Sequence, residues 1–165
     1  MKVAVHDSIA EIDSAAWNAL AGREFPFLRH EVLELAETTG SVSPDAGWTP
    51  RHLAIYDGTR LRAAMPLYEK SHSWGEFVFD WAWAQAYQRA GFPYYPKLVA
   101  AVPFTPAPST RLLRAQPDDD EAASALLEAA TGLATETGCS SVHVLFPAPE
   151  ELPLLERHGL LVRKD

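Results

Sequence analysis

The sequence of this 165-residue chain lacks several features that would define its class at once. Its one cysteine, Cys139, cannot form an internal disulfide, so no oxidising compartment is indicated. No stretch approaches the roughly 20 uninterrupted apolar residues of a membrane-spanning helix, so we expect no membrane insertion. The apolar run before Asp7 is too short for a secretory signal. These absences make a cytoplasmic location the expectation.

The charge balance also lacks a basic excess. The formal net charge is −8, and lysine and arginine form no run, which argues against DNA binding through the phosphate backbone. Acidic residues cluster once, at Asp118–Glu121, and we expect this cluster to begin a helix rather than to hold a metal. With 47% hydrophobic and 22% charged residues, the chain has a globular composition. Its length predicts one domain spanning residues 1–165.

The pattern along the chain predicts alternating strands and helices. Strands are expected at residues 2–6, 51–56, 60–68, 76–79, 98–102, 112–114 and 141–146, with a further one beginning near residue 160. Helices are expected after Asp13, around Leu28–Ala36, and over residues 81–90, 119–137 and 150–158. The dipeptide Asp57-Gly58 favours a tight turn between antiparallel strands. This order predicts an α/β (α+β) fold, with one mixed, mostly antiparallel sheet flanked by helices.

The segment from Ser71 to Tyr95 is unusually aromatic. It holds nine of the chain's 17 aromatic residues, interleaved with His72, Glu76 and Asp80. A spacing of four would align these three side chains on a helix and could suit a metal. The preceding sequence, with Gly75, is poor for a helix, so we expect no metal site. A loop that binds a substrate or takes up a proton fits better, as does a structural interpretation with Asp80 as a helix cap.

Other candidates follow the aromatic segment. Tyr94, Tyr95 and Lys97 lie at the start of the expected central strand, where an ammonium group could hold an anion and the tyrosines could equally cover the core. Thr105 and Arg111 belong to a proline-rich loop that could contact an anionic ligand. No Walker loop, dinucleotide fingerprint or Gly-x-Ser-x-Gly elbow occurs, and His143 and the other scattered histidines receive no role.

Four motifs in order carry a resemblance to a known family: the stretches 71–80, 81–84, 94–98 and 102–106. Together with His6–Ile9 and Phe25–Leu28, they resemble a bacterial family labelled peptidoglycan biosynthesis/recognition. That family is similar to Fem-type aminoacyltransferases, within the GNAT-like acyltransferase superfamily. Family members carry a glycine in the turn where this chain reads 107–111, and they have a second GNAT-like half. The resemblance therefore implies the N-terminal half of a longer protein, cut before the last strands of its sheet.

The resemblance implies N-acyltransferase activity, with acyl or aminoacyl transfer to an amine of a peptidoglycan precursor or another small molecule. Acyl-CoA or aminoacyl-tRNA would be the donor, and no covalently bound cofactor or metal is needed. By position, Glu76 or Asp80 would be the base and His72 or Tyr95 a polar orienting group, with Ser73, Tyr94 and Thr105 as further binding residues. Lys97 or Arg111 would contact an anion.

Two alternatives stay open. The chain could be a non-catalytic module that recognises a cell-wall precursor or peptide through its aromatic loop. It could also be inactive alone and self-associate through the edge of a shortened sheet.

Overall fold

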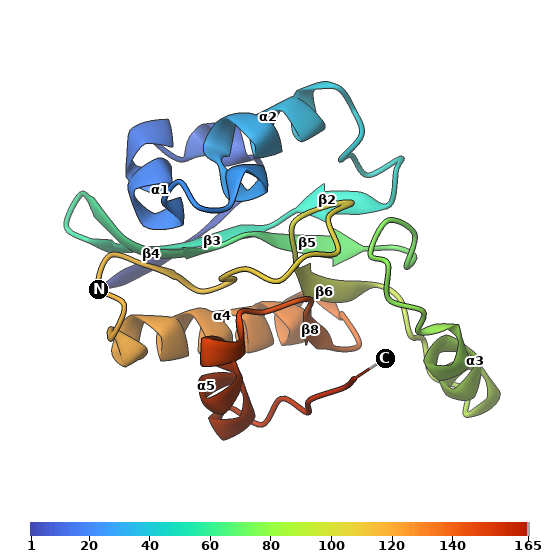
Figure 1. Ribbon diagram of the computed structural model, residues 1–165. Helices are drawn as coiled ribbons and strands as arrows, with labels where there is room; N and C mark the ends of the chain where they lie inside the picture. The colour runs from blue at the N-terminus through green and yellow to red at the C-terminus, as the bar shows by residue number, and fades with distance from the viewer. Residues whose placement is uncertain (165) are drawn as a thin grey trace.

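Two four-stranded sheets form the middle layer of the molecule, and the computed structural model describes residues 1–164 (Figure 1). Within this range, every pair of neighbouring strands is antiparallel except β6 and β8. The first sheet has the order β1 (Lys2–His6), β3 (His52–Asp57), β4 (Arg60–Met65) and β7 (Leu113–Arg114). The second has the order β2 (Trp48–Pro50), β5 (Leu67–Lys70), β6 (Lys97–Ala100) and β8 (Val142–Val144).

One long hairpin contributes to both sheets. Strand β2 runs into β3 with only Arg51 between them, and β4 runs into β5 with only Pro66 between them. Proline has no N–H group for the ladder, so regular pairing is interrupted there. The backbone N–H of Arg51 still donates to the Leu67 carbonyl at 2.8 Å. The α+β class and a tight turn at the predicted place are confirmed, with Gly58 and Thr59 between the paired residues Asp57 and Arg60, but the expected single sheet is divided in two.

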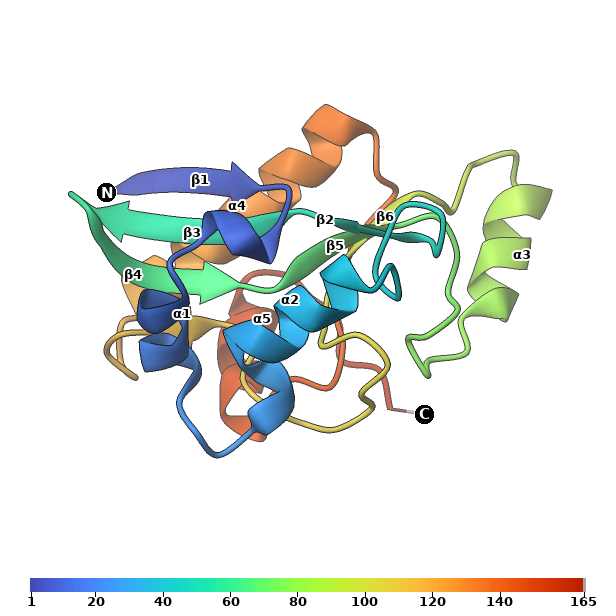
Figure 2. The ribbon, with the colours of Figure 1, turned by 90° about the horizontal axis from the view of Figure 1, so that it is seen from above.

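Helices cover both faces of this layer (Figures 1 and 2). On one face, α4 (Asp120–Thr137) and α5 (Leu152–Arg157) pack on a core that includes Leu53, Met65 and Leu98. On the other face lie α1 (Ser14–Ala21) and α2 (His30–Thr38). Short 3₁₀ turns occupy Ile9–Glu11, Pro26–Leu28 and Pro149–Glu151. A register shift between Ile55 and Tyr56 accompanies a change of face along β4: Leu61 packs in the second core, whereas Met65 packs in the first.

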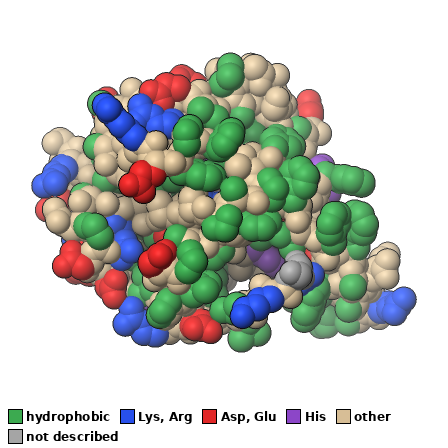
Figure 3. Space-filling model, in the orientation of Figure 1, with side chains coloured by type: hydrophobic (Ala, Val, Ile, Leu, Met, Phe, Trp, Pro, Cys, Tyr) green, Lys and Arg blue, Asp and Glu red, His purple; other side chains and the backbone are tan. Residues whose placement is uncertain are grey.

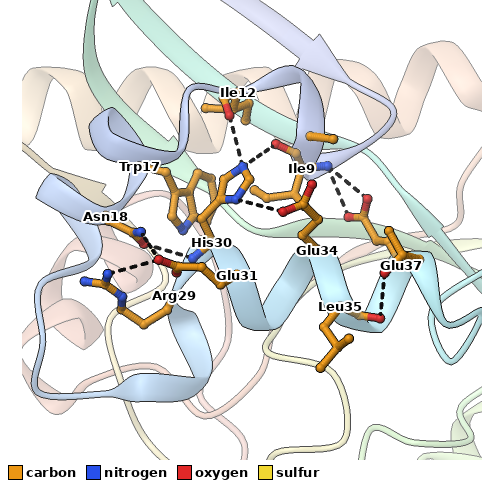
Figure 4. Close-up of polar contacts among 12 residues, drawn as sticks. Ile9, Ile12, Trp17, Asn18, Arg29, His30, Glu31, Glu34, Leu35 and Glu37 are labelled. Atoms are coloured by element: carbon orange, nitrogen blue, oxygen red, sulfur yellow. Dashed lines mark hydrogen bonds and ion pairs between the residues drawn. The ribbon is translucent and has the colours of Figure 1, made fainter.

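The second helix begins later than predicted. Helix α2 begins at His30 rather than Leu28, and it buries Leu33 while Val32 and Leu35 are exposed. The buried His30 ring fixes this orientation, because its Nε2 lies 2.8 Å and 3.0 Å from the carbonyls of Ile9 and Ile12 (Figure 4). At the other end of the helix, Glu37 accepts from the Ile9 N–H and from His52.

Helix α4 confirms the interpretation of the acidic run. Asp119 is its N-cap and accepts from the Ala122 N–H at 3.1 Å. Both carboxylate oxygens of Asp119 also bind the Arg62 guanidinium, at 2.7 and 2.8 Å. The helix ends at Gly138, whose left-handed backbone suits a glycine. The Asp119 carboxylate at this helix start is therefore stabilised by the Ala122 N–H and by its ion pair with Arg62.

The aromatic segment departs most from the prediction. Residues 76–79 form no strand, because Phe77 has a φ of 58° and the chain from 71 to 80 is irregular. Helix α3 (Trp81–Arg89) follows as expected, and β6 is a buried central strand between β5 and β8. The predicted strand at residues 160–163 is absent from the described chain, and β8 lies at the edge of its sheet. Among residues 1–164, no helix has the length and apolar character to span a bilayer.

Candidate active site

Strand pairing brings two buried lysines together. Lys70 in β5 and Lys97 in β6 are direct antiparallel partners, so their side chains lie on the same face of the second sheet. Both residues have 0% exposure. Charged groups in such positions require partners, because an isolated buried ammonium costs several kcal/mol. The partners come from the irregular segment that crosses this face.

Two carboxylates of that segment bind Lys97. Its Nζ lies 2.9 Å from Oε2 of Glu76 and 2.5 Å from Oδ2 of Asp80. All three side chains are at most 2% exposed, and we call them the carboxylate–lysine cluster. Asp80 stands at the N-cap position of α3 but makes no side-chain cap bond. Its carboxylate instead accepts from Lys97 and from the Tyr94 hydroxyl, so the predicted role of Asp80 as a capping side chain is wrong.

The two carboxyl groups differ in acidity. Burial raises the pKa of Glu76, and the nearby Lys97 ammonium offsets only part of that effect. For Asp80, burial acts in the same upward direction, but hydrogen bonds from Lys97 and Tyr94 contribute to a net lowering of the pKa. Divergent pKa values in one site are typical of an acid–base pair. Glu76 is therefore the group better suited to exchange a proton, and Asp80 the one better suited to stay ionised.

Tyrosines enclose the cluster. The Tyr94 hydroxyl donates to Asp80 at 2.5 Å, and this contact with burial raises the pKa of Tyr94 far above its ordinary value. The Tyr95 hydroxyl lies 2.6 Å from Oγ of Ser73. Nζ of Lys97 is 5.3 Å and 5.8 Å from the ring centroids of Tyr94 and Tyr95, within cation–π range. The structure thus brings together five of the predicted binding and catalytic residues around Lys97.

A pocket of about 620 Å³ lies beside the cluster. Glu76, Asp80 and Lys97 line it, and its other walls come from the outer side of β8, from α3 and from the last described residues. One oxygen of each carboxylate, Oε1 of Glu76 and Oδ1 of Asp80, is buried and has no hydrogen-bond partner among the described residues. Buried acceptors of this kind are unfavourable until a donor reaches them. The pocket is therefore suited to a ligand that carries an N–H or ammonium group.

His143 is a site residue that the sequence analysis missed. It lies on β8 opposite Val99 and lines the pocket, with Nε2 2.8 Å from Oγ of Ser141. Burial, and then the Lys97 charge, lower its pKa to about 4, so the imidazole is neutral at pH 7. The alternating pattern of residues 141–146 would have placed His143 beside Lys97 only if the parallel pairing of β6 and β8 were known.

His72 does not reach this pocket. Its ring lies over the backbone of Gly47, where a Cβ would be 2.2 Å from Nε2, and its Nδ1 accepts from the Trp74 N–H at 3.2 Å. Of the four candidates His72, Glu76, Asp80 and Lys97, only the last three therefore line this pocket. Irregular backbone between His72 and Glu76 removes the helical alignment that a spacing of four requires.

The proline-rich loop also lies apart from the cluster. Arg111 is fully buried, and its guanidinium donates to the carbonyls of Leu145, Ser109 and Ala107. An arginine whose N–H groups donate to backbone carbonyls stabilises the conformation of the loop and has few N–H groups available to bind an anion. Thr105 donates to the Pro103 carbonyl. The structure therefore does not support the predicted anion contact at Arg111.

Two further buried charges escaped the sequence analysis. Nζ of Lys70 lies 3.7 Å from the Trp48 ring centroid and donates to the Trp74 carbonyl at 3.0 Å. Burial lowers the pKa of Lys70 to about 8. Glu151 accepts from the backbone N–H groups of Arg111 and Leu112 at 3.0 and 2.8 Å. The residues next to Lys70 and Glu151 in the sequence do not indicate that either is buried, because the burial of both depends on contacts formed only in the folded chain.

This arrangement defines an α+β domain with a mostly apolar pocket, into whose lining two carboxylates and a lysine are set, each carboxylate with one unpartnered oxygen. A comparison with protein-family models identifies it further: the FemAB-like family, described as peptidoglycan biosynthesis/recognition, matches residues 8–165. The chain belongs to this family, which confirms the resemblance carried by the four motifs. No curated protein matches the chain.

Proposed function

We propose that this chain transfers an acyl or aminoacyl group to the amine of a peptidoglycan precursor or a related small molecule. The observation that carries the proposal is the pair of buried, unpartnered carboxylate oxygens on Glu76 and Asp80, two residues that line the pocket. Glu76, Asp80 and Lys97 together carry one negative charge when both carboxyls are ionised, and the neighbouring Lys70 ammonium offsets it, so the unpartnered oxygens are what suits the pocket to an ammonium group. Membership in the FemAB-like family supports a role in peptidoglycan biosynthesis or recognition.

In the proposed reaction, Glu76 removes a proton from the bound amine, and the free amine attacks the donor's carbonyl carbon. The new C–N bond forms as the thioester or ester bond breaks, and the leaving sulfur or oxygen takes up a proton. Two N–H groups of Lys97 donate to Glu76 and Asp80, and its third N–H can stabilise the oxyanion. The donor in this proposal is acyl-CoA or aminoacyl-tRNA, and the location is the cytoplasm.

One observation favours the recognition module as a second candidate. Lys97 already binds both carboxylates, so each is engaged in an ion pair before any substrate arrives. A pocket of this kind can bind an amine without removing its proton. The same residues then select a cationic peptide group and no group is transferred.

One experiment separates the two functions. Purified chain is titrated calorimetrically with acyl-CoA, with aminoacyl-tRNA and with muropeptides, and amide formation is followed by mass spectrometry. We expect donor binding and transfer that Glu76→Gln reduces at least 100-fold, as for loss of a general base. The matched control Glu136→Gln, at an exposed position of α4, leaves transfer unchanged. Muropeptide binding with neither donor binding nor transfer supports the recognition module instead, and full activity in both Glu76→Gln and Asp80→Asn refutes the assigned base.

A further inference from the structure

Large aromatic side chains gather on one exposed part of the molecule. Six rings from residues 74–92 are each about half exposed or more, and we call them the aromatic surface: Trp74, Phe77, Phe79, Trp81, Trp83 and Phe92. Three of them touch, since the centroids of Trp74 and Phe79 lie 5.9 and 5.4 Å from that of Trp81. Exposed aromatic groups of this number usually mark an interaction site.

Helix α3 at the centre of this surface is not covered by the rest of the protein. None of its nine residues is buried, and Figure 1 shows the helix projecting from the end of the second sheet. In Figure 3, apolar side chains are frequent on this side of the molecule, with polar and basic groups between them. Isolated helices shorter than roughly 12 residues are marginal in water, and helices in proteins gain stability by burying an apolar face. The helix therefore has an apolar side that a partner outside the chain can cover.

The charges around the aromatic surface identify the kind of partner. The chain has 22 acidic residues, yet residues 71–97 contain only Glu76 and Asp80, and both are buried in the ion cluster. Arg89 is exposed at the end of α3, and Arg163 donates to the Phe79 carbonyl. In a chain with a net charge of −8, this surface thus presents apolar rings and the exposed Arg89, with no exposed carboxylate from residues 71–97.

We propose that the aromatic surface docks on a phospholipid bilayer, with the rings at headgroup level and Arg89 facing lipid phosphates. Tryptophan and other aromatic residues favour this interfacial depth, and a projecting helix can reach it while the acidic remainder stays in water. Docking at the surface needs no helix that crosses the bilayer. Phe77 and Trp83 also line the site pocket, so docking places the pocket mouth at the lipid surface.

The chain's tryptophans supply a direct probe of this proposal. Trp17 and Trp48 are 0% and 1% exposed, so a change in emission on adding lipid reports the three tryptophans of the aromatic surface. We expect a blue shift and co-flotation with vesicles of phosphatidylcholine and phosphatidylglycerol, and weaker binding to phosphatidylcholine alone. High salt should weaken the binding to the anionic vesicles, because it screens the charge of Arg89.

Two variants distinguish lipid binding through the aromatic surface from nonspecific adsorption to vesicles. The double variant Phe79→Ala with Trp81→Ala should reduce vesicle partitioning roughly tenfold or more, since two large rings are lost. The control Phe27→Ala removes an aromatic ring that is 52% exposed in the Pro26–Leu28 turn, away from α3, and should not change partitioning.

Three outcomes would overturn the proposal. The first is unchanged emission and no flotation at high lipid. The second is equal partitioning of the double variant and the control. The third is a change in the emission of the same tryptophans that follows dimer formation or the addition of muropeptides but not the addition of vesicles. Because vesicle binding is measured without donor or acceptor, its failure would leave the proposed transfer untouched.

Discussion

Removing the ammonium group of Lys97 tests the buried cluster most directly. In Lys97→Met, the stem keeps its volume, but Glu76 and Asp80 lose the cation that lies 2.9 and 2.5 Å away. Breaking a buried ion pair by removing one partner costs about 3–5 kcal/mol. For a chain of this size, each kcal/mol lowers the melting temperature by about 2–4 °C, so we expect a loss of at least 6 °C.

The pH dependence of the same variant gives a sharper criterion. In the native protein, the pKa of Asp80 is lowered, so its contribution to stability is present at pH 7 and is lost as pH falls. Without Lys97, burial raises the pKa of both carboxyls above their unfolded values. Their protonated forms then stabilise the fold, and this stability is lost as pH rises. Lys97→Met should therefore be closer to the native protein at pH 4.5 than at pH 7.

Urea unfolding at the two pH values, followed by circular dichroism, measures both effects. The triple variant Lys97→Met, Glu76→Gln, Asp80→Asn serves as the control, because it removes the charges together and should recover most of the loss at pH 7. A Lys97→Met protein within 1 kcal/mol of the native one, with the same pH profile, would refute a desolvated cluster and with it the proposed site chemistry.

Three further perturbations follow from the structure. Burial lowers the pKa of His143 to about 4, so the contribution of the neutral imidazole to the free energy of unfolding is complete above pH 6.5 and is lost as pH falls towards 4. In His143→Phe, the difference in the free energy of unfolding between pH 7 and pH 4, measured with urea, should be smaller by about 3 kcal/mol. Gly47→Ala should cost at least about 2 kcal/mol, because φ is +79° and a Cβ would meet His72; adding His72→Ala should recover only part of it in the same assay. Glu151→Gln weakens the acceptor of the Arg111 N–H, and trypsin should cut the loop at residues 107–112 faster.

The fold could be predicted where the signal is local. Asp119 and Gly138 mark the ends of α4 by their capping chemistry, and the Asp57-Gly58 turn fixes the hairpin. The prediction of the fold failed where a contact between residues distant in sequence determines the local structure. The face of α2 depends on a hydrogen bond from His30 to a carbonyl 21 residues away, and the division into two sheets depends on Pro66. Periodicity within one helix or strand carries no information about either.

The site could be predicted in part for a similar reason. The rare combination of acids and rings identified Glu76, Asp80, Tyr94 and Lys97, which the structure joins by hydrogen bonds. His143 escaped because its place depends on a parallel strand pairing across 44 residues of chain. The predicted self-association through the sheet edge stays a prediction, with β8 as the edge strand that would carry it.

The long hairpin has a consequence for how the chain reaches its native state. Strands β1 and β3 are separated by about 50 residues, and β7 joins β4 from a similar distance, whereas the hairpin from Trp48 to Lys70 is local in sequence. Local pairings form before distant ones, because they close shorter loops. We therefore expect the hairpin to be the nucleus onto which both sheets grow, with its central amides the last to exchange with deuterium.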